Sequence, residues 1–194
     1  LNEHQEILQS YDKVCIYAGT IGSFYGISYI IDSINNFNFN NNKKIALILI
    51  GDGDYKTIAE DYLEKNKIND IFIFDTVSKS YLFSLMKKCS FSILSLPDNE
   101  THEYGIASLK SIDYLYAGIP ILMIGPFKQY SILRKSSYQF NAEFGNISEM
   151  LNEYHKLSNL DISKKERIKR DYHNILENHC SARTVKKELK EIFI

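Results

Sequence analysis

The sequence predicts an α/β domain in which a parallel sheet of about six strands is flanked by helices. Two observations predict it: apolar runs of strand length alternate with longer amphipathic stretches, and several of these runs are apolar at every position. The 194 residues, 44% of them hydrophobic, suit a single globular domain. Strands that alternate with helices form right-handed βαβ units, and such units build a Rossmann-like sheet.

Six apolar runs are predicted as the strands of this sheet. The first runs from Val14 to Ala18 without a charged side chain and ends at Gly19, as expected of a strand that is buried on both faces. The second, Ile45–Ile50, is apolar throughout. In order, the predicted strands comprise residues 14–18, 45–50, 71–74, 91–95, 121–124 and 138–140.

Amphipathic stretches between these runs are predicted as helices. Ser23 is expected to cap the first helix, whose apolar side carries Ile27, Ile30, Ile31 and Ile34. The asparagine-rich residues 35–42 show no periodicity and are predicted as a polar loop. The remaining predicted helices comprise residues 55–65, 79–88, 109–116, 130–135, 148–156, 163–177 and 182–192.

The whole chain, residues 1–194, is predicted as one domain with three parts. Residues 1–12 are polar and are expected to be the remnant of a linker, residues 13–141 form the sheet with its helices, and residues 142–194 form a helical tail. Because the first residue is not methionine, we expect that a further domain precedes this sequence in the full-length protein.

Composition excludes several classes of function. The formal net charge of −1 argues against a dedicated nucleic-acid-binding protein. The three cysteines are far apart and in no C-x-x-C spacing, so neither a zinc site nor a disulfide framework is expected. No leader peptide or stretch of about 20 apolar residues is present. We therefore expect a cytoplasmic protein.

The carboxyl ends of the predicted strands meet at one rim of the sheet, where such folds bind ligands. Gly19 and Gly22 flank a turn between strand and helix, which allows a close backbone approach to an anion or simply makes a tight turn. The turn lacks the spacing of a G-x-G-x-x-G fingerprint. In the turn at residues 51–53, Asp52 is expected to bond its own backbone.

Lys110 is the most informative charged residue at this rim. It falls in the first turn of the predicted helix 109–116, where a positive charge opposes the helix dipole. A bound anion would resolve this conflict. A solvated pair between Lys110 and Asp113, three residues later, explains the lysine equally well.

Four segments, taken in order, resemble the carboxyl-terminal donor-binding domain of GT-B glycosyltransferases of the family 4 type. Residues 13–22 carry a YxGxxG pattern, residues 49–53 read LIGDG, and residues 71–77 are similar to VxFxGxV with Asp75 in place of glycine. The most diagnostic segment, residues 104–120, reads YGIxxxKxxDYLxAGxP and resembles members that build bacterial surface polysaccharides such as capsule or O-antigen.

This resemblance implies a site for a nucleotide-sugar donor, a UDP-sugar or a GDP-sugar, without a metal or other cofactor. Lys110 would be the catalytic residue that stabilises the diphosphate leaving group, and Asp113 would accept hydrogen bonds from the ribose. Phe74 and Val77 would meet the base, and the first glycine turn would meet the phosphates. The implied donor-binding residues are Gly19, Thr20, Ile21, Gly22, Phe74, Val77, Tyr104, Gly105, Lys110 and Asp113.

The sequence also departs from the family pattern. Many relatives hold the phosphates with an Arg and a Lys after the first glycine, where this chain has Thr20 and Tyr25, so Lys128 and Arg134 are weaker candidates for a second cation. The first acid of the family's E-x7-E pattern would fall at Gly105. The roles of His102 and Glu103 stay open.

The leading functional hypothesis is retaining transfer of a glycosyl group to a surface-polysaccharide or lipid-linked acceptor. The resemblance assigns this activity to a full-length protein with an amino-terminal acceptor-binding domain, so this chain alone is expected to be inactive. It leaves open a peripheral association of the full-length protein with the inner face of the cell membrane. A nucleotide-sugar epimerase of GT-B fold and a non-catalytic Rossmann-like binding module are the alternatives.

Overall fold

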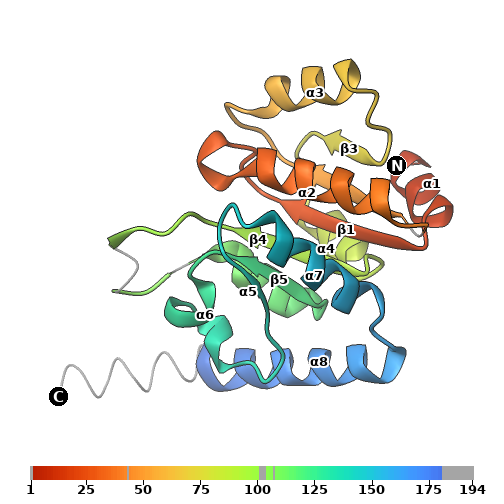
Figure 1. Cartoon of the computed structure of the whole chain (residues 1–194). Coiled ribbons are helices and arrows are strands. Elements are labelled where there is room, and N and C mark those ends of the chain that lie inside the picture. The colour runs from red at the N-terminus through yellow and green to blue at the C-terminus, as the bar shows by residue number, and fades with distance from the viewer. Residues whose placement is uncertain (1, 43, 101–103, 107, 181–194) are drawn as a thin grey trace.

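A six-stranded, wholly parallel sheet forms the centre of the computed structural model, which describes residues 2–42, 44–100, 104–106 and 108–180. The strands lie in the order β3-β2-β1-β4-β5-β6 (Figure 1). This order confirms the predicted Rossmann-like sheet. The strands are β1 (Lys13–Ala18), β2 (Ile45–Ile50), β3 (Ile71–Phe74), β4 (Phe91–Ser95), β5 (Ile121–Ile124) and β6 (Phe140–Ala142).

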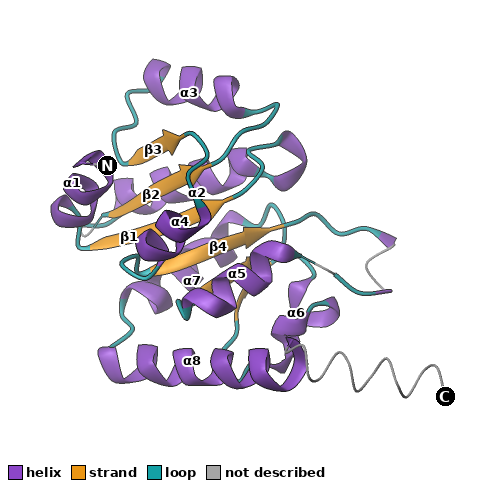
Figure 2. Ribbon diagram, turned by 180° about the vertical axis from the view of Figure 1, so that it is seen from behind, coloured by secondary structure: helices purple, strands orange, loops and turns teal. Residues whose placement is uncertain are grey.

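Helices cover both faces of the sheet. One face is covered by α2 (Ile27–Asn40) and α7 (Ile147–Ser158), which contact each other, as Figure 1 shows. Figure 2, seen from behind, shows α4 (Lys79–Met86) and α5 (Leu109–Ala117) on the opposite face. The other helices are α1 (Asn2–Ser10), α3 (Lys56–Lys65), α6 (Phe127–Tyr130) and α8 (Ile162–Ile175).

The predicted linker is a helix. Residues 2–10 form α1, and its Ile7 is buried in the main hydrophobic core. His4 is also buried, with its ring centroid 4.1 Å from that of Phe74 and its Nδ1 atom 3.2 Å from the hydroxyl of Tyr81. The burial of Ile7 and the contacts of His4 with β3 and α4 therefore hold a segment whose composition is that of a linker.

The asparagine-rich segment is also helical, since α2 continues to Asn40. Phe37 is buried in the core. The amide of Asn38 bonds both backbone groups of Ile45 at the start of β2: its Oδ1 accepts from the N–H at 2.8 Å and its Nδ2 donates to the carbonyl at 2.9 Å. Tertiary contacts thus override the loop-forming tendency of the asparagines.

The predicted cap of α2 was wrong. Ser23 belongs to a 3₁₀ turn before the helix, and its hydroxyl donates to the Asp54 carboxylate at 2.9 Å. Gly26 precedes the first residue of α2. The predicted helix 130–135 is divided into α6 and a 3₁₀ turn, Ile132–Lys135, which the side chain of Ser131 caps.

The carboxyl-terminal helices belong to the packed domain. Tyr154 of α7 is fully buried, and its hydroxyl lies 2.8 Å from that of Ser33 in α2. Tyr172 of α8 is buried as well, and α8 contacts α5. The predicted helix 182–192 lies outside the described residues. Within the part of the chain that the structure describes, no helix has the length and apolar character needed to cross a membrane.

Candidate functional site

A pocket of about 410 Å³ opens at the carboxyl ends of the central strands. The sheet order places it where β1 and β4 are neighbours and the chain winds away in opposite directions, which is the usual ligand position in such sheets. The residues that line it come from the end of β4 and from the segments that follow β1, β4 and β5. They are Tyr25, Leu94, Ser95, Leu96, Gly105, Ile106, Ser108, Leu109, Lys110 and Phe127.

Lys110 and Gly19 are in direct contact at this pocket. The lysine lies in the first turn of α5, and its side chain crosses the backbone of Gly19 after β1. A Cβ atom at Gly19 would lie 2.1 Å from Lys110 Cε and 2.8 Å from Nζ. Glycine is therefore required at position 19 for the lysine to lie as it does, and the structure brings together two residues that were predicted separately.

The Lys110 ammonium is held by aromatic side chains. Nζ donates a hydrogen bond to the Tyr17 hydroxyl at 2.8 Å and lies 4.2 Å from the ring centroid of Tyr25. Cation–π contacts of this kind stabilise a cation by about 0.5–2 kcal/mol. Burial raises the pKa of Tyr17 well above its ordinary value, so its hydroxyl stays neutral and supplies no counter-charge.

No carboxylate of the described residues forms an ion pair with Lys110. Burial lowers the pKa of its ammonium to about 8, because removing a charge from water is unfavourable unless an opposite charge replaces the hydration. Ser108, at the amino-terminal cap of the same helix, makes no side-chain capping bond. The pocket therefore presents a desolvated cation beside an uncapped helix terminus, an arrangement suited to an anion.

Asp113 points to a different partner. Its Oδ1 lies 3.0 Å from Nζ of Lys79, the first residue of α4, so the solvated pair with Lys110 that the sequence allowed is not formed. Lys79 follows Val77 by two residues, which places the Asp113 carboxylate next to the loop between β3 and α4. The Asp113 side chain is 26% exposed and so remains accessible to a ligand.

The first glycine turn is bonded to the loop after β2. Ile21 donates its N–H to the carbonyl of Asp52 at 2.8 Å and accepts from the N–H of Tyr55 at 3.1 Å. Since its side chain is also fully buried, Ile21 has no group left for a ligand. Asp52 Oδ1 accepts from Gly53 N–H at 2.8 Å, which confirms the predicted backbone-bonded turn.

The other predicted residues are spread along the rim. The Phe74 carbonyl accepts from Gly51 N–H at 3.0 Å, and Val77 is half-buried against the core. Tyr104 is 87% exposed, whereas the adjacent Gly105 lines the pocket. Thr20 is exposed, Gly22 is buried, and Lys128 lines a second pocket.

His102 and Glu103 lie outside the described residues. Arg134 is exposed, with one guanidinium nitrogen 3.5 Å from the carbonyl of Gln129, and it does not line the pocket. Among the described residues, no group of three or more His, Cys, Asp or Glu side chains is arranged to hold a metal ion.

Two residues of the site were missed from the sequence. Tyr17 lies in the apolar run of β1, and nothing in that run distinguishes its hydroxyl from those of buried core tyrosines. Ser95 is the last residue of β4, it is 4% exposed, and its hydroxyl has no hydrogen-bond partner within the part of the chain that the structure describes. A polar residue at the carboxyl end of an otherwise apolar strand is a signal that would have identified Ser95.

Comparisons with solved structures identify the fold. The chain superposes on the C-terminal domain of a group 1 glycosyl transferase, LpcC of Francisella tularensis, with a TM-score of 0.67 and 12% identity, covering 92% of this chain and 93% of that one. The fold is that of the C-terminal half of a GT-B glycosyltransferase. No protein-family profile matches the sequence, and no curated protein is significantly similar to it.

Two larger structures contain the same GT-B half. A mutant of TarM from S. aureus, solved with UDP among its ligands, matches with a TM-score of 0.73 and 15% identity over 92% of this chain. The UDP-forming α,α-trehalose-phosphate synthase of Burkholderia xenovorans matches with a TM-score of 0.76 and 14% identity over the whole chain. This chain spans 35% and 46% of those two proteins, respectively.

Proposed function

We propose that this chain is the donor-binding half of a two-domain glycosyltransferase and that its Lys110 pocket binds the diphosphate of a nucleotide sugar. The observation that carries the proposal is the Lys110 ammonium, which is desolvated and lacks a carboxylate partner among the described residues. A diphosphate supplies the missing negative charge. The similarity in fold to TarM, solved with UDP, supports a nucleotide as its source.

The helix terminus and the lysine act on the same group in this proposal. The first-turn N–H groups of α5 donate to the phosphate oxygens, and Lys110 Nζ lies across Gly19 to meet them from the other side. When the bond between the sugar and the diphosphate breaks, negative charge grows on the departing diphosphate. Lys110 is therefore the catalytic residue, since its charge stabilises the transition state more than the bound donor.

The nucleoside extends toward the loop between β3 and α4. Asp113 accepts hydrogen bonds from the ribose hydroxyls, and the chain around Phe74 and Val77 contacts the base. Thr20 and Gly22 border the phosphates, and Tyr104 and Gly105 border the sugar. Ile21 takes no part, because both of its backbone groups are already bonded within the protein.

The acceptor is held largely by the other half of the protein. This chain spans less than half of TarM or the trehalose-phosphate synthase, and a cleft between two domains is where the GT-B fold brings donor and acceptor together. We propose transfer with retention to a surface-polysaccharide or lipid-linked acceptor, performed by the full-length protein and not by this chain alone.

Calorimetric titration of this chain with UDP, GDP and ADP tests the donor site. At least one of the three is expected to bind at millimolar concentration or below, and the matching nucleoside without phosphates at least about tenfold more weakly, because the loss of a charge-assisted hydrogen bond removes about 1.5–3 kcal/mol. Absence of binding by all three nucleotides at millimolar concentration would contradict the proposal.

Asp113→Asn is expected to remove the preference for ribose. The unaltered chain should bind UDP about tenfold more tightly than 2′-deoxy-UDP, or the corresponding pair for GDP, because only the ribose diol can donate twice to the carboxylate. The variant should bind the two compounds equally. Lys79→Met, which removes the partner of Asp113 and leaves the carboxylate, serves as the matched control and should keep the preference.

Donor binding is expected to weaken as the pH rises above 8. The pKa of Lys110 is about 8 in the free chain, and a bound diphosphate raises it because it favours the charged form. The site therefore takes up a proton on binding above pH 8, and the affinity falls about tenfold per pH unit until the pH reaches the pKa of Lys110 in the complex. Calorimetry in two buffers of different ionisation enthalpy measures this uptake, and Lys110→Arg should abolish it.

A further inference from the structure

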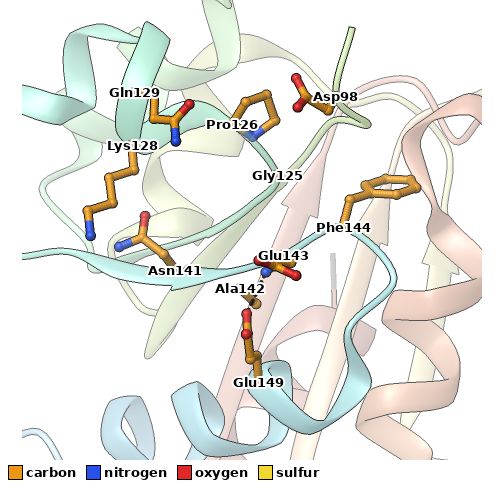
Figure 3. A pocket seen from close by; sticks show the side chains of 10 residues that line it. All are labelled: Asp98, Gly125, Pro126, Lys128, Gln129, Asn141, Ala142, Glu143, Phe144 and Glu149. Carbon is orange, nitrogen blue, oxygen red and sulfur yellow. Dashed lines mark hydrogen bonds between the residues drawn. The ribbon is translucent and has the colours of Figure 1, made fainter.

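A second pocket lies on the same rim of the sheet, between the ends of β5 and β6. Its volume is about 510 Å³, and its floor is formed by Gly125 and Ala142, whose backbones are joined by a hydrogen bond of 2.9 Å. Side chains from α6, β6 and the first turn of α7 form its walls (Figure 3). The proposed donor site makes no use of this pocket.

The two pockets lie on either side of one short segment. Gly125 and Pro126 line the second pocket, and the next residue, Phe127, lines the Lys110 pocket. Ligands in the two pockets would therefore be neighbours along the rim, as the two substrates of a transfer reaction must be.

The charges of the two pockets are opposite. The described residues that line the Lys110 pocket include one ammonium group and no carboxylate. Among the described residues that line the second pocket, three carry a carboxylate (Asp98, Glu143 and Glu149) and one, Lys128, carries an ammonium group. An anion such as a phosphate is thus disfavoured in the second pocket, and no group of His, Cys, Asp or Glu among the described residues is arranged to hold a metal ion. The lining therefore favours a ligand that carries no negative charge.

The polar groups of the second pocket suit a ligand rich in hydroxyl groups. Figure 3 shows the amides of Gln129 and Asn141 facing each other on one side, and each amide can both donate and accept. The Asn141 Oδ1 atom is buried and has no hydrogen-bond partner among the described residues. Glu149 is already fixed, because its Oε2 accepts from Glu143 N–H at 2.7 Å, and its second oxygen adds an acceptor.

An aromatic ring completes the pocket on the opposite side. Phe144 lies across from the two amides in Figure 3 and is held edge-on against Tyr29, with ring centroids 5.6 Å apart. A fixed apolar ring beside amide and carboxylate groups matches a sugar ring, which presents C–H groups on its faces and hydroxyl groups at its edge.

We propose that this second pocket binds a neutral sugar unit of the acceptor glycan. The donor-binding half thereby holds part of the acceptor itself, next to the donor, and contributes to acceptor specificity. The assignment to the acceptor rests on the proposed function, whereas the binding of a neutral sugar to this pocket does not.

Amide chemical shifts of ¹⁵N-labelled chain report on both pockets in one experiment. The probes are the methyl glycosides of glucose, galactose, mannose and N-acetylglucosamine, with UDP, GDP and pyrophosphate added to separate samples. At least one glycoside is expected to shift the amides of Gly125 and residues 127–129 and 141–144 in a saturable manner at millimolar concentration. The amides of Gly19 and Lys110 should stay unshifted by it.

Gln129→Ala and Asn141→Leu test the polar contacts. Each substitution is expected to lower the affinity about tenfold for the glycoside that binds, as the loss of one good hydrogen bond implies. Gln129 is exposed, so its variant keeps the fold even if the strand variant does not. Gln5→Ala is the matched control, since Gln5 is exposed, lines neither pocket and should leave glycoside binding unchanged.

Two outcomes would contradict the proposal that the second pocket binds a sugar. One is that no glycoside of the panel shifts the amides around Gly125 and Asn141. The other is that pyrophosphate, rather than a glycoside, shifts them. The nucleotide samples report separately on the donor site. If a glycoside shifts the amides of the second pocket but neither UDP nor GDP shifts amides near Lys110, the second pocket is supported as a sugar site and the proposed function is contradicted.

Discussion

Lys110→Met is expected to raise the free energy of unfolding of this chain at pH 7 by about 1–3 kcal/mol while weakening nucleotide binding at least about a hundredfold. The wild-type chain buries an ammonium group that lacks a carboxylate partner among the described residues. Methionine has a similar length and fills the same space between Gly19 and the two tyrosine rings without a charge to desolvate. One substitution thus separates stability from binding, because the cation is unfavourable for the fold and needed for the ligand.

The pH dependence of this gain follows from the pKa of Lys110. Folding lowers that pKa from 10.5 to about 8. Between pH 8 and pH 10.5 the unfolded chain therefore binds more protons than the folded one, and the stability of the wild-type chain rises with pH in this window. The variant has no such group. The difference in the free energy of unfolding between the variant and the wild type should therefore be largest at pH 7 and nearly absent above pH 10.5.

Urea denaturation at pH 7 and pH 10.5 measures both effects. Lys128→Met is the matched control, because Lys128 is exposed and its replacement should change the unfolding free energy by less than about 0.5 kcal/mol. A Lys110→Met variant that is less stable than the wild type at pH 7 would show that the aromatic contacts outweigh the desolvation of the ammonium, and it would remove the main argument for an anion site.

Gly51→Ala is expected to destabilise the domain by about 2–4 kcal/mol. Gly51 has a φ of +156°, and a Cβ atom there would lie 1.9 Å from the carbonyl oxygen of Gly19. That oxygen belongs to the backbone and cannot move aside without breaking the contact between the two rim loops. The cost combines backbone strain and overpacking, each of about 1–3 kcal/mol.

The same substitution should also weaken nucleotide binding, because Gly19 is displaced from beneath Lys110. Chemical denaturation measures the stability, and calorimetry with the nucleotide that binds the wild type measures the affinity. Asp52→Ala, in the same loop, removes only the bond from Asp52 Oδ1 to Gly53 N–H and should cost about 0.5–1.5 kcal/mol. Equal losses for the two variants would contradict the importance of the close backbone contact.

The sheet could be predicted because its strands are apolar at nearly every position. The predicted bounds of β2, β3, β4 and β5 agree with the structure. A short apolar run between turn residues in an α/β protein usually forms a buried strand. The failures lie where tertiary contacts decide. Nothing local distinguishes α1 from a linker or the end of α2 from an asparagine-rich loop, because the burial of Ile7 in the core and the bonds of Asn38 to Ile45 form only in the folded domain.

The candidate site was predictable in part. The positions of the strand ends placed Gly19 and Lys110 on one rim. The unfavourable position of a positive charge at the amino terminus of a helix indicated that Lys110 could bind an anion. Their contact was not predictable, because it depends on the direction in which the lysine crosses the turn. The contribution of Tyr17 was hidden for a related reason: one hydroxyl in a buried strand looks like core packing until its partner is known.

The position of β1 in the sheet has a consequence for synthesis of the chain. β1 pairs with β2, which follows soon after it, and with β4, which begins only at Phe91. While the chain grows, the β1 edge that faces β4 keeps its backbone groups unpaired and its apolar side chains uncovered. A nascent chain that stalls before Phe91 is thus exposed to aggregation, and the closing of that edge is a slow, long-range step in folding.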